Sequence, residues 1–190
     1  LLSRFAWRAG ADWVVPFDAD ELWFADEGLL APRLRSLAGD VVGARMVNTF
    51  PTADGGWGMD PSPQIHGKVA FRSHPLATLS QGNHGVDRPG ARVPRSEVEL
   101  RIAHLPWRSF EQFAAKLRQG ARAYEGVSAR TEVGEHWRSL GRASEESLAR
   151  DWAAMLAGEA VEGMHWSPRG PLVAADPRQW ATWDPRQALV

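Results

Sequence analysis

Four parts of the chain carry the apolar spacing or the end signals of an α-helix. The expected helices cover residues 1–9, 29–37, 110–121 and 144–156. Gly10 and Gly158 end the first and the last of them, because glycine readily takes the left-handed conformation found after helix C-termini. Ser109 precedes the third helix and Ser144 begins the fourth, and Gln112 completes a capping box with Ser109.

Short apolar runs between turn-forming residues predict the strands. They cover residues 13–17, 41–50, 68–72, 77–80 and 97–104. The first run is apolar without interruption, which is typical of a strand buried on both faces of a sheet. Because a helix lies between the first two strands, we expect these two to pair in parallel. The three later strands are expected to form a smaller antiparallel portion.

Two regions lack these patterns. Residues 51–63 are rich in Pro, Gly and Asp, and we expect a surface loop that carries Trp57. Residues 166–190 are rich in Pro and Trp and are expected to form an irregular tail. With 190 residues and 44% hydrophobic content, the chain is long enough for one folded domain, which we assign to residues 1–165. The order of elements predicts an α/β protein.

The composition excludes several classes of protein. The formal net charge is −1, so the overall field favours neither nucleic acid nor an anionic membrane as a partner. Cysteine is absent, which excludes disulfides, thiolate nucleophiles and cysteine-based zinc sites. No apolar run approaches the ~20 residues that span a bilayer, and no signal-peptide pattern opens the chain. We therefore expect a cytoplasmic protein without a transmembrane segment.

Arginine and tryptophan are over-represented. Lysine occurs only at positions 68 and 116, and ten residues are tryptophan. Guanidinium groups suit phosphates, and indole rings suit the faces of sugars. The composition is therefore compatible with a substrate that carries both phosphate groups and a sugar.

An acidic group follows the first apolar run. Asp18, Asp20 and Glu21 come directly after residues 13–17. In an extended chain, residues two apart point to the same side, so Asp18 and Asp20 can present two carboxylates to one ligand. Carboxylates at a strand end suit a divalent cation that also binds substrate phosphates. The sequence therefore indicates a Mg²⁺ or Mn²⁺ site, with a capped turn as the alternative interpretation.

Four blocks of sequence share their order with a known family. The first covers residues 13–24 and reads WVVPFDADELWF, with an Asp-x-Asp-Glu motif. The later blocks read HGKVAFR, QGNHGV and RIAHLPWRSFEQFAAKLRQGARAY. Together they resemble a bacterial branch of the family 2-like glycosyltransferases, over roughly residues 1 to 140.

The resemblance implies a GT-A fold, with a partial Rossmann-like mixed sheet flanked by helices, a small antiparallel portion and C-terminal helices. It implies an enzyme that moves a sugar, with inversion, from a nucleotide-diphosphate donor to a hydroxyl of a glycan, lipid-linked or protein acceptor. Mn²⁺ or Mg²⁺ would bridge the donor diphosphate to Asp18 and Asp20. The nucleotide-binding units of such enzymes precede the Asp-x-Asp strand. Because only one helix precedes it here, and the chain begins without Met, we expect a fragment that lacks this half.

Three further residues are candidates for the site, and His104 gains its role from the same resemblance. His104 could be the third protein ligand of the metal, since imidazole suits manganese; the alternative is a strand-end histidine bonded to the backbone. His84 lies in a glycine-flanked turn and could contact the donor or the acceptor, or be a plain turn histidine. Lys68, in the second block, is assigned to substrate binding.

Cationic and aromatic residues complete the predicted substrate site. Arg108 lies just before the N-terminus of a helix that contains Lys116 and Arg118, and together these cations could neutralise a leaving diphosphate, with Arg108 and Lys116 favoured because both fall in the fourth block. The alternative is a solvated helix face. Trp57 and Trp107 could stack on a sugar or a nucleobase, and core packing is the alternative for both.

The catalytic base has two candidates. Asp87, just after the turn that contains His84, is the first, and Glu21 is the second. Glu21 could instead orient the metal ligands. The Glu-Asp pair found downstream of the metal motif in classical family 2 enzymes is not evident in this chain.

Two other classes of protein remain open. A phosphohydrolase of the haloacid dehalogenase type also begins with an apolar strand and Asp-x-Asp, and Asp18 would then be its nucleophile. That class normally has Thr or Val soon after the second Asp, where this chain has Glu-Leu-Trp. The other alternative is an inactive, non-catalytic remnant that binds a carbohydrate or a nucleotide.

Overall fold

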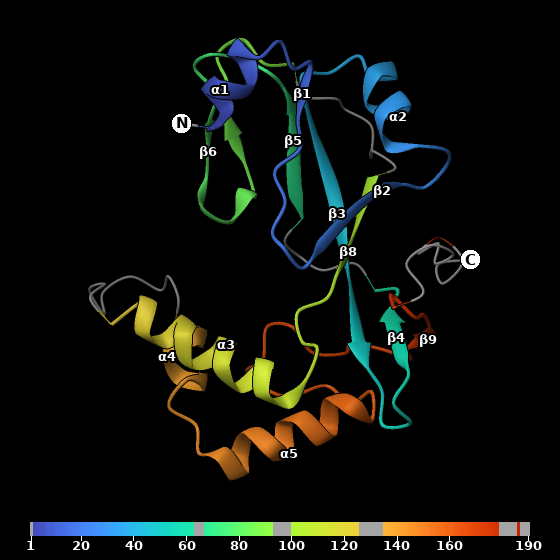
Figure 1. The fold of residues 1–190 in the computed structure, drawn as a ribbon, viewed down its shortest axis with the longest axis vertical. Helices are drawn as coiled ribbons and strands as arrows, with labels where there is room; N and C mark the ends of the chain where they lie inside the picture. Colours follow the sequence, from blue (N-terminus) through green and yellow to red (C-terminus); the bar gives the residue numbers. More distant parts are fainter. Residues whose placement is uncertain (1, 63–66, 93–99, 126–134, 179–185, 187–190) are drawn as a thin grey trace. The chain divides into compact units, whose positions relative to one another are not determined.

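The structure is a computed structural model that describes residues 2–62, 67–92, 100–125, 135–178 and 186. The chain forms two compact units. Unit 1 consists of Leu1–Val47 and Pro63–His104, and unit 2 consists of Asn48–Ser62 and Leu105–Val190. Figure 1 shows the elements of both, and each unit is described by itself below.

Unit 1 contains two short helices and most of the strands. Its elements are α1 (Leu2–Arg8), β1 (Trp13–Val14), β2 (Glu21–Ala25), α2 (Leu30–Ser36), the first part of β3 (Val41–Pro51), β5 (Lys68–Arg72), β6 (Thr78–Leu79), the 3-10 helix η1 (Gln81–Asn83), β7 (Val86–Asp87) and β8 (Leu100–His104).

Antiparallel pairing sets the register of unit 1. β5 lies between β1 and β3 and is antiparallel to both, with Phe71 opposite Val14 on one side and Val41 on the other. β2 is antiparallel to β8, which also pairs with β3, and Glu21 lies opposite His104. β6 and β7 form a separate two-stranded sheet. The β2–β8 register therefore brings the first residue of one strand beside the last residue of the other.

The core of unit 1 lies between α2 and these strands. Its buried members are Ala25, Leu34, Val42, Ala44, Met46, Ala70, Leu100 and Ile102. The two-residue period of a strand explains why Val42, Ala44 and Met46 all point to the core. Leu34 is the buried residue of α2. This apolar layer holds the strands whose ends carry the polar residues discussed below.

Unit 2 consists of a small sheet and a group of helices. Its elements are the second part of β3, β4 (Trp57–Asp60), α3 (Phe110–Ala123), α4 (Glu135–Leu140), α5 (Glu145–Leu156) and β9 (Val173–Ala174). β4 is antiparallel to both β3 and β9. Its core contains Phe50, Trp107, Phe113, Ala114, Leu117, Leu148, Met155 and Met164. The rings of Trp107 and Phe113 meet edge to face with centroids 5.0 Å apart, a favourable arrangement for aromatic pairs.

The helix ends follow the sequence signals. Ser109 Oγ accepts a hydrogen bond from the Gln112 amide at 3.2 Å, and Ser144 Oγ accepts one from Ser147 at 3.1 Å. The Gln112 side chain accepts from the amide of Arg108 at 3.0 Å, one residue earlier than a regular capping box would require. The N-caps of α3 and α5 are thereby confirmed.

The prediction for residues 13–17 was wrong. Only Trp13 and Val14 form a strand, Phe17 is 67% exposed, and β5 separates β1 from β3, so the expected parallel neighbours do not pair. Pro16 supplies a physical reason, because proline has no N–H to continue the ladder. The five-residue strand of this region is β2, which follows Asp18 and Asp20 instead of preceding them and begins at Glu21.

The prediction of a loop over residues 51–63 was wrong in part. The loop is the short turn from Thr52 to Gly56, closed by a hydrogen bond from the Thr52 amide to the Gly56 carbonyl at 3.1 Å. β4 follows it, and Met59 and Asp60 are fully buried. The Asp60 carboxylate accepts hydrogen bonds from the amides of Ser62 and Arg169, which explains an acid at a buried position.

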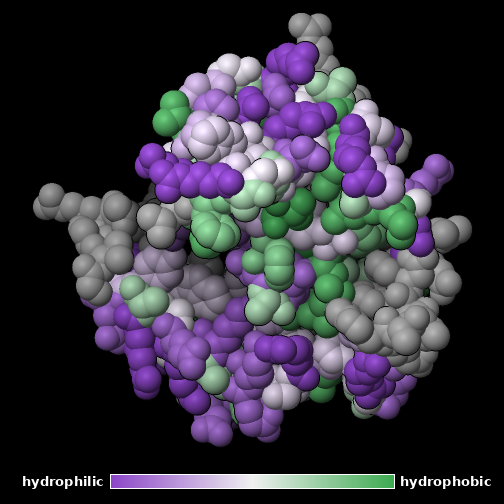
Figure 2. Space-filling view, turned by 45° about the horizontal axis from the view of Figure 1, so that its top comes forward, coloured by the Kyte–Doolittle hydropathy of each residue, from purple (hydrophilic) through white to green (hydrophobic). Residues whose placement is uncertain are grey.

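Several large apolar side chains reach the surface. They include Leu2 at 82% exposure, Phe5 at 71%, Trp7 at 46% and Leu76 at 68%. Figure 2 shows one face of the molecule, on which hydrophobic and hydrophilic residues are interspersed. Among the described residues, no helix has the length and apolarity needed to cross a membrane.

Candidate functional site

Five of the predicted site residues lie together in unit 1. They are Asp18, Asp20, Glu21, Lys68 and His104, and we call them the carboxylate–lysine cluster. Asp18 and Asp20 lie in the turn before β2, and Glu21 begins that strand. Lys68 begins β5, and His104 ends β8 opposite Glu21. The cluster therefore forms where the ends of three strands converge.

Lys68 is the centre of this cluster. Its Nζ lies 2.5 Å from Asp18 Oδ2 and 2.6 Å from Glu21 Oε1. The side chains of Lys68 and Glu21 are 5% and 2% exposed, whereas that of Asp18 is 57% exposed. Burial alone would lower the pKa of Lys68, but the hydrogen bonds and charges of Asp18 and Glu21 outweigh it and raise the pKa above its usual value. Lys68 is therefore held as a cation.

Glu21 holds the turn that presents Asp18. Its Oε2 accepts a hydrogen bond from the Asp18 amide at 3.1 Å, and its own amide donates to the Asp18 carbonyl at 3.1 Å. With its other oxygen on Lys68, this buried carboxylate uses both oxygens inside the cluster. This geometry is that of a positioning residue. It corresponds to the role of orienting the metal ligands, which was considered for Glu21 beside the role of catalytic base.

Asp20 and His104 form the other pair of the cluster. His104 Nε2 lies 3.7 Å from Asp20 Oδ2, and the two side chains are 5% and 18% exposed. Donors of one divalent ion lie about 2.1 Å from it, so two of them can be at most about 4.2 Å apart. The observed separation meets that condition. Asp20 and His104 are therefore close enough to share a cation.

Asp18, the third predicted ligand, is engaged differently. Its carboxylate pairs with the Lys68 ammonium, and it is the most exposed acid of the cluster. Within the described residues, no group of three or more His, Asp or Glu side chains is arranged to hold a metal ion. The metal site thus stays a prediction, with two of its three ligands suitably close.

His84 reaches the backbone beside Lys68. Its Nδ1 lies 2.7 Å from the carbonyl oxygen of Gly67. The ring also packs on Gly82, where an added Cβ would lie 2.6 Å from His84 Nε2. Gly82 has φ of +70°, which favours glycine at this position. The third sequence block therefore contacts the second through His84.

Asp87 lies apart from the cluster in the sheet topology. It is exposed at the end of β7, opposite Thr78 in the separate β6–β7 sheet. Among the described residues, no hydrogen bond or ion pair joins Asp87 to the carboxylate–lysine cluster. Its role as the base stays a prediction.

The remaining predicted residues lie in unit 2. Trp107 is 1% exposed, and its Nε1 donates to the Trp166 carbonyl at 2.8 Å. Lys116 Nζ lies 5.2 Å and 5.1 Å from the ring centroids of Trp107 and Trp166, and it donates to the Pro106 carbonyl at 3.3 Å. Core packing, the alternative left open for Trp107, is what this geometry shows. Lys116 is held in the same structural contacts.

Arg108 and Trp57 are more accessible. Arg108 is exposed directly before the N-cap of α3. Trp57 is half-buried at the start of β4, and its carbonyl accepts a hydrogen bond from the Ala175 amide at 2.9 Å. Neither is placed relative to the carboxylate–lysine cluster, because the cluster lies in the other unit.

One grouping of arginines was not recognised from the sequence, although Arg118 was considered there as one of the cations for a leaving diphosphate. Arg118, Arg122, Arg138 and Arg142 line a cavity in unit 2. Arg118 and Arg122 are four positions apart on α3, which places two cations on one face of that helix. That spacing was the available signal.

No protein family, curated protein or solved structure matches the chain. The likeness to family 2-like glycosyltransferases therefore depends on the four sequence blocks.

Proposed function

We propose that this chain is the metal-binding part of a GT-A glycosyltransferase, which transfers a sugar from a nucleotide-diphosphate donor to an acceptor hydroxyl. One observation carries the proposal: residues from all four family-like blocks meet in unit 1. Asp18, Lys68 and His104 bring three blocks to the carboxylate–lysine cluster. His84 brings the fourth to the backbone next to Lys68. This convergence on one place supports a shared function for the four blocks.

The charge of the cluster supports a cation site. Three carboxylates and one ammonium converge there, so the formal charge is negative when His104 is neutral. Asp20 and His104 would hold the cation, and Asp18 would join them from its exposed position. A bound Mn²⁺ or Mg²⁺ supplies positive charge to the diphosphate of the donor. Lys68 and Glu21 fix the turn that carries Asp18.

Proton removal from the acceptor falls to Asp87 in this proposal. An exposed carboxylate can accept a proton from an acceptor hydroxyl, whereas Glu21 is buried and paired with Lys68. Inversion at the anomeric carbon would follow from direct attack of the acceptor on the donor. The acceptor is a glycan, lipid-linked or protein hydroxyl.

Metal titration of the whole chain tests the proposal. We expect the chain to bind Mn²⁺, observed as loss of the free-ion signal in electron paramagnetic resonance, and Asp20→Asn and His104→Gln each to weaken this binding at least tenfold. Glu146→Gln is the control, because this exposed glutamate on α5 lies in the other unit. Unchanged Mn²⁺ binding in both cluster variants would refute the metal site.

A second measurement addresses the donor. Calorimetry with nucleoside diphosphates, in the presence and absence of Mn²⁺, is expected to show binding that depends on the metal. A remnant that has lost its binding functions as well would bind neither the metal nor the nucleotide. Trapping of a phosphorylated Asp18 would favour the phosphohydrolase instead, because in that class this carboxylate is the nucleophile.

A further inference from the structure

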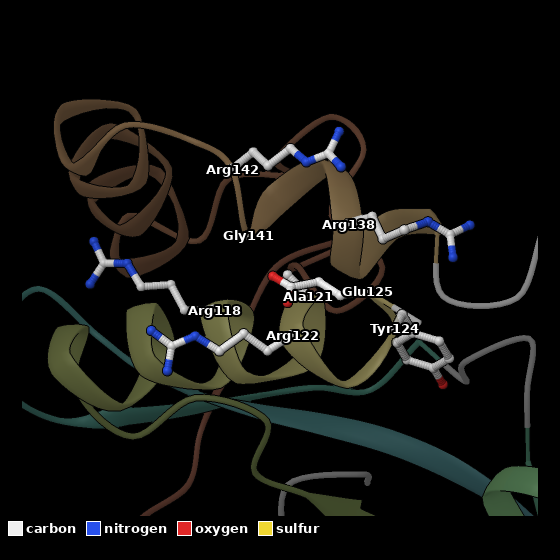
Figure 3. A pocket seen from close by; sticks show the side chains of 8 residues that line it. All are labelled: Arg118, Ala121, Arg122, Tyr124, Glu125, Arg138, Gly141 and Arg142. Atoms are coloured by element: carbon white, nitrogen blue, oxygen red, sulfur yellow. The ribbon is translucent and has the colours of Figure 1, made fainter. Parts of the chain in front are cut away.

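A cavity of about 500 Å³ lies in unit 2, between α3, α4 and the turn that follows α4. Its lining residues are Arg118, Ala121, Arg122, Tyr124, Glu125, Arg138, Gly141 and Arg142. Cavities of this size accommodate small organic ligands, which typically occupy about 300–1,000 Å³. Figure 3 shows the cavity and these side chains.

Close packing of the two helices fixes the cavity. Gly120 of α3 lies so near the ring of Trp137 that a Cβ there would overlap it. Gly141 likewise lies against Ala121, and a side chain at this position would overlap the Ala121 methyl group. The amide of Gly141 donates to the Trp137 carbonyl at 2.9 Å, which closes the end of α4. The arginines therefore project from two rigidly packed elements.

The cavity concentrates positive charge. Four guanidinium groups and one carboxylate, that of Glu125, line it, which gives a formal charge of +3. The chain as a whole has a net charge of −1, so this charge is local. In the described part of the chain, the guanidinium groups of Arg118, Arg122 and Arg142 form no salt bridge. Arg101 and Arg178, by contrast, have carboxylate partners at 2.6 Å and 2.9 Å.

The arginines form two pairs. Arg118 and Arg122 are one turn apart on α3, and Figure 3 shows both extending to one side of the cavity. Arg138 and Arg142 also lie four positions apart and extend to the opposite side of that view. Guanidinium groups bind phosphate with two parallel hydrogen bonds, and a pair of them can share one phosphate.

We propose that this cavity binds a small molecule with at least two phosphate groups, one at each arginine pair. The proposal goes beyond the glycosyltransferase assignment, because the cavity and the carboxylate–lysine cluster lie in different units. A ligand of this kind would offset the mutual repulsion of the guanidinium groups with charge-assisted hydrogen bonds. Glu125 opposes it, because its carboxylate repels an anion.

Calorimetry with phosphate, pyrophosphate and tripolyphosphate tests the inference. The titrations use the full chain in buffer with a chelator, so that no metal contributes. We expect affinity to rise at least tenfold from phosphate to tripolyphosphate, because the longer anion reaches both pairs. Arg118→Gln/Arg122→Gln and Arg138→Gln/Arg142→Gln should each abolish that gain, while Arg150→Gln, an exposed arginine on α5, should leave it within twofold.

Two more variants keep the result interpretable. Arg142→Gln alone changes an exposed residue and should still weaken tripolyphosphate binding several-fold if a double variant fails to fold. Glu125→Gln should tighten binding a few-fold, which loss of structure would not do. Equal affinities for phosphate and tripolyphosphate, or binding unaffected by either double variant, would overturn the inference.

Two organic probes distinguish the sources of such a ligand. Uridine triphosphate represents nucleotides, and geranyl diphosphate represents prenyl diphosphates. Uridine triphosphate is compared with tripolyphosphate, and geranyl diphosphate is compared with pyrophosphate. The organic probe that binds more tightly than its inorganic counterpart identifies the class of ligand. Asp20→Asn should bind tripolyphosphate like the unaltered chain, so failure of the metal site and failure of this cavity are separable.

Discussion

The ammonium of Lys68 lies 2.5 Å from the carboxylate of Asp18, although fifty positions separate the two residues in the sequence. The same ammonium reaches the buried Glu21 at 2.6 Å. A single lysine at the start of β5 thus fixes the turn before β2. The proposed metal site depends on this turn, so the ion pairs of Lys68 connect the stability of unit 1 with its chemistry.

Removal of the Lys68 charge should destabilise the protein. Lys68→Met leaves the Glu21 carboxylate, 2% exposed, without its partner, and we expect a loss of about 3–5 kcal/mol in the free energy of unfolding. Urea denaturation measures this. The double variant Glu21→Gln/Lys68→Met should lose less than Lys68→Met alone, because no buried charge remains. A single variant within about 1 kcal/mol of the unaltered chain would contradict the assigned ion pair.

The raised pKa of Lys68 predicts a loss of stability at high pH. The folded state binds this proton more tightly than the unfolded state, whose lysine titrates near 10.5. The stabilisation is therefore complete below that pH and is lost as the pH rises through the folded pKa. Melting temperatures measured from pH 8 to 11.5 should converge for the unaltered chain and Lys68→Met. If the melting temperatures of the two proteins differ by the same amount over this whole pH range, the protonation of Lys68 does not contribute to stability.

Asp40 should stabilise unit 1 in the opposite pH range. The Arg92 amide hydrogen bond lowers its pKa, burial opposes this, and the side chains of Arg92 and Arg88 lower it further. This stabilisation is present above the unfolded value of 3.8 and is lost as the pH falls through the lower folded pKa. Asp40→Asn should cost about 1–3 kcal/mol at pH 7, by chemical denaturation. The difference in unfolding free energy between Asp40→Asn and the unaltered chain should shrink below pH 3.8. A difference that stays constant would argue against ionisation of Asp40 as the cause.

Lys116 should stabilise the folded protein through its contacts with two indole rings. Lys116→Met removes the cation from the rings of Trp107 and Trp166, and we expect a loss of about 0.5–2 kcal/mol. Tryptophan fluorescence during denaturation reports the change. Arg108→Gln, which alters an exposed side chain before α3, is the comparison and should cost less. Weaker nucleotide binding in Lys116→Met without any loss of stability would instead support the substrate role predicted from the sequence.

Gly120→Ala tests the contact between α3 and α4. Alanine usually stabilises a helix interior by about 1 kcal/mol relative to glycine. Here its Cβ would overlap the Trp137 ring, so we expect a net loss of about 1–3 kcal/mol in thermal or chemical denaturation. Combining Gly120→Ala with Trp137→Ala should restore the usual gain from alanine, measured against Trp137→Ala alone. Stabilisation by the single change would mean that the helices are not this closely packed.

Local signals in the sequence predicted the helices whose ends carry a capping serine or a glycine. Ser109 and Ser144 set the starts of α3 and α5, and Gly10 follows α1 with φ of +77°. The apolar run before Asp18 was misinterpreted because hydrophobicity alone does not show whether a backbone amide can pair. Pro16 interrupts the ladder there.

The sequence predicted which residues belong to the candidate site, but not which of them contact one another. The acidic motif and the family-like blocks identified Asp18, Asp20, Glu21, Lys68 and His104. Their pairing depends on the β2–β8 register and on β5, which are long-range features that no local pattern specifies. The ion pair from Lys68 to Asp18 and the burial of Trp107 therefore became visible only in the structure.

The opening helix α1 has a practical consequence. Leu2, Phe5 and Trp7 all face solvent, and Ser3 is its buried residue. Exposed apolar side chains attract one another and bind hydrophobic dyes. Preparations of this chain should therefore self-associate as concentration rises, and charged substitutions at Leu2 and Phe5 offer a simple way to keep them monodisperse for every titration above.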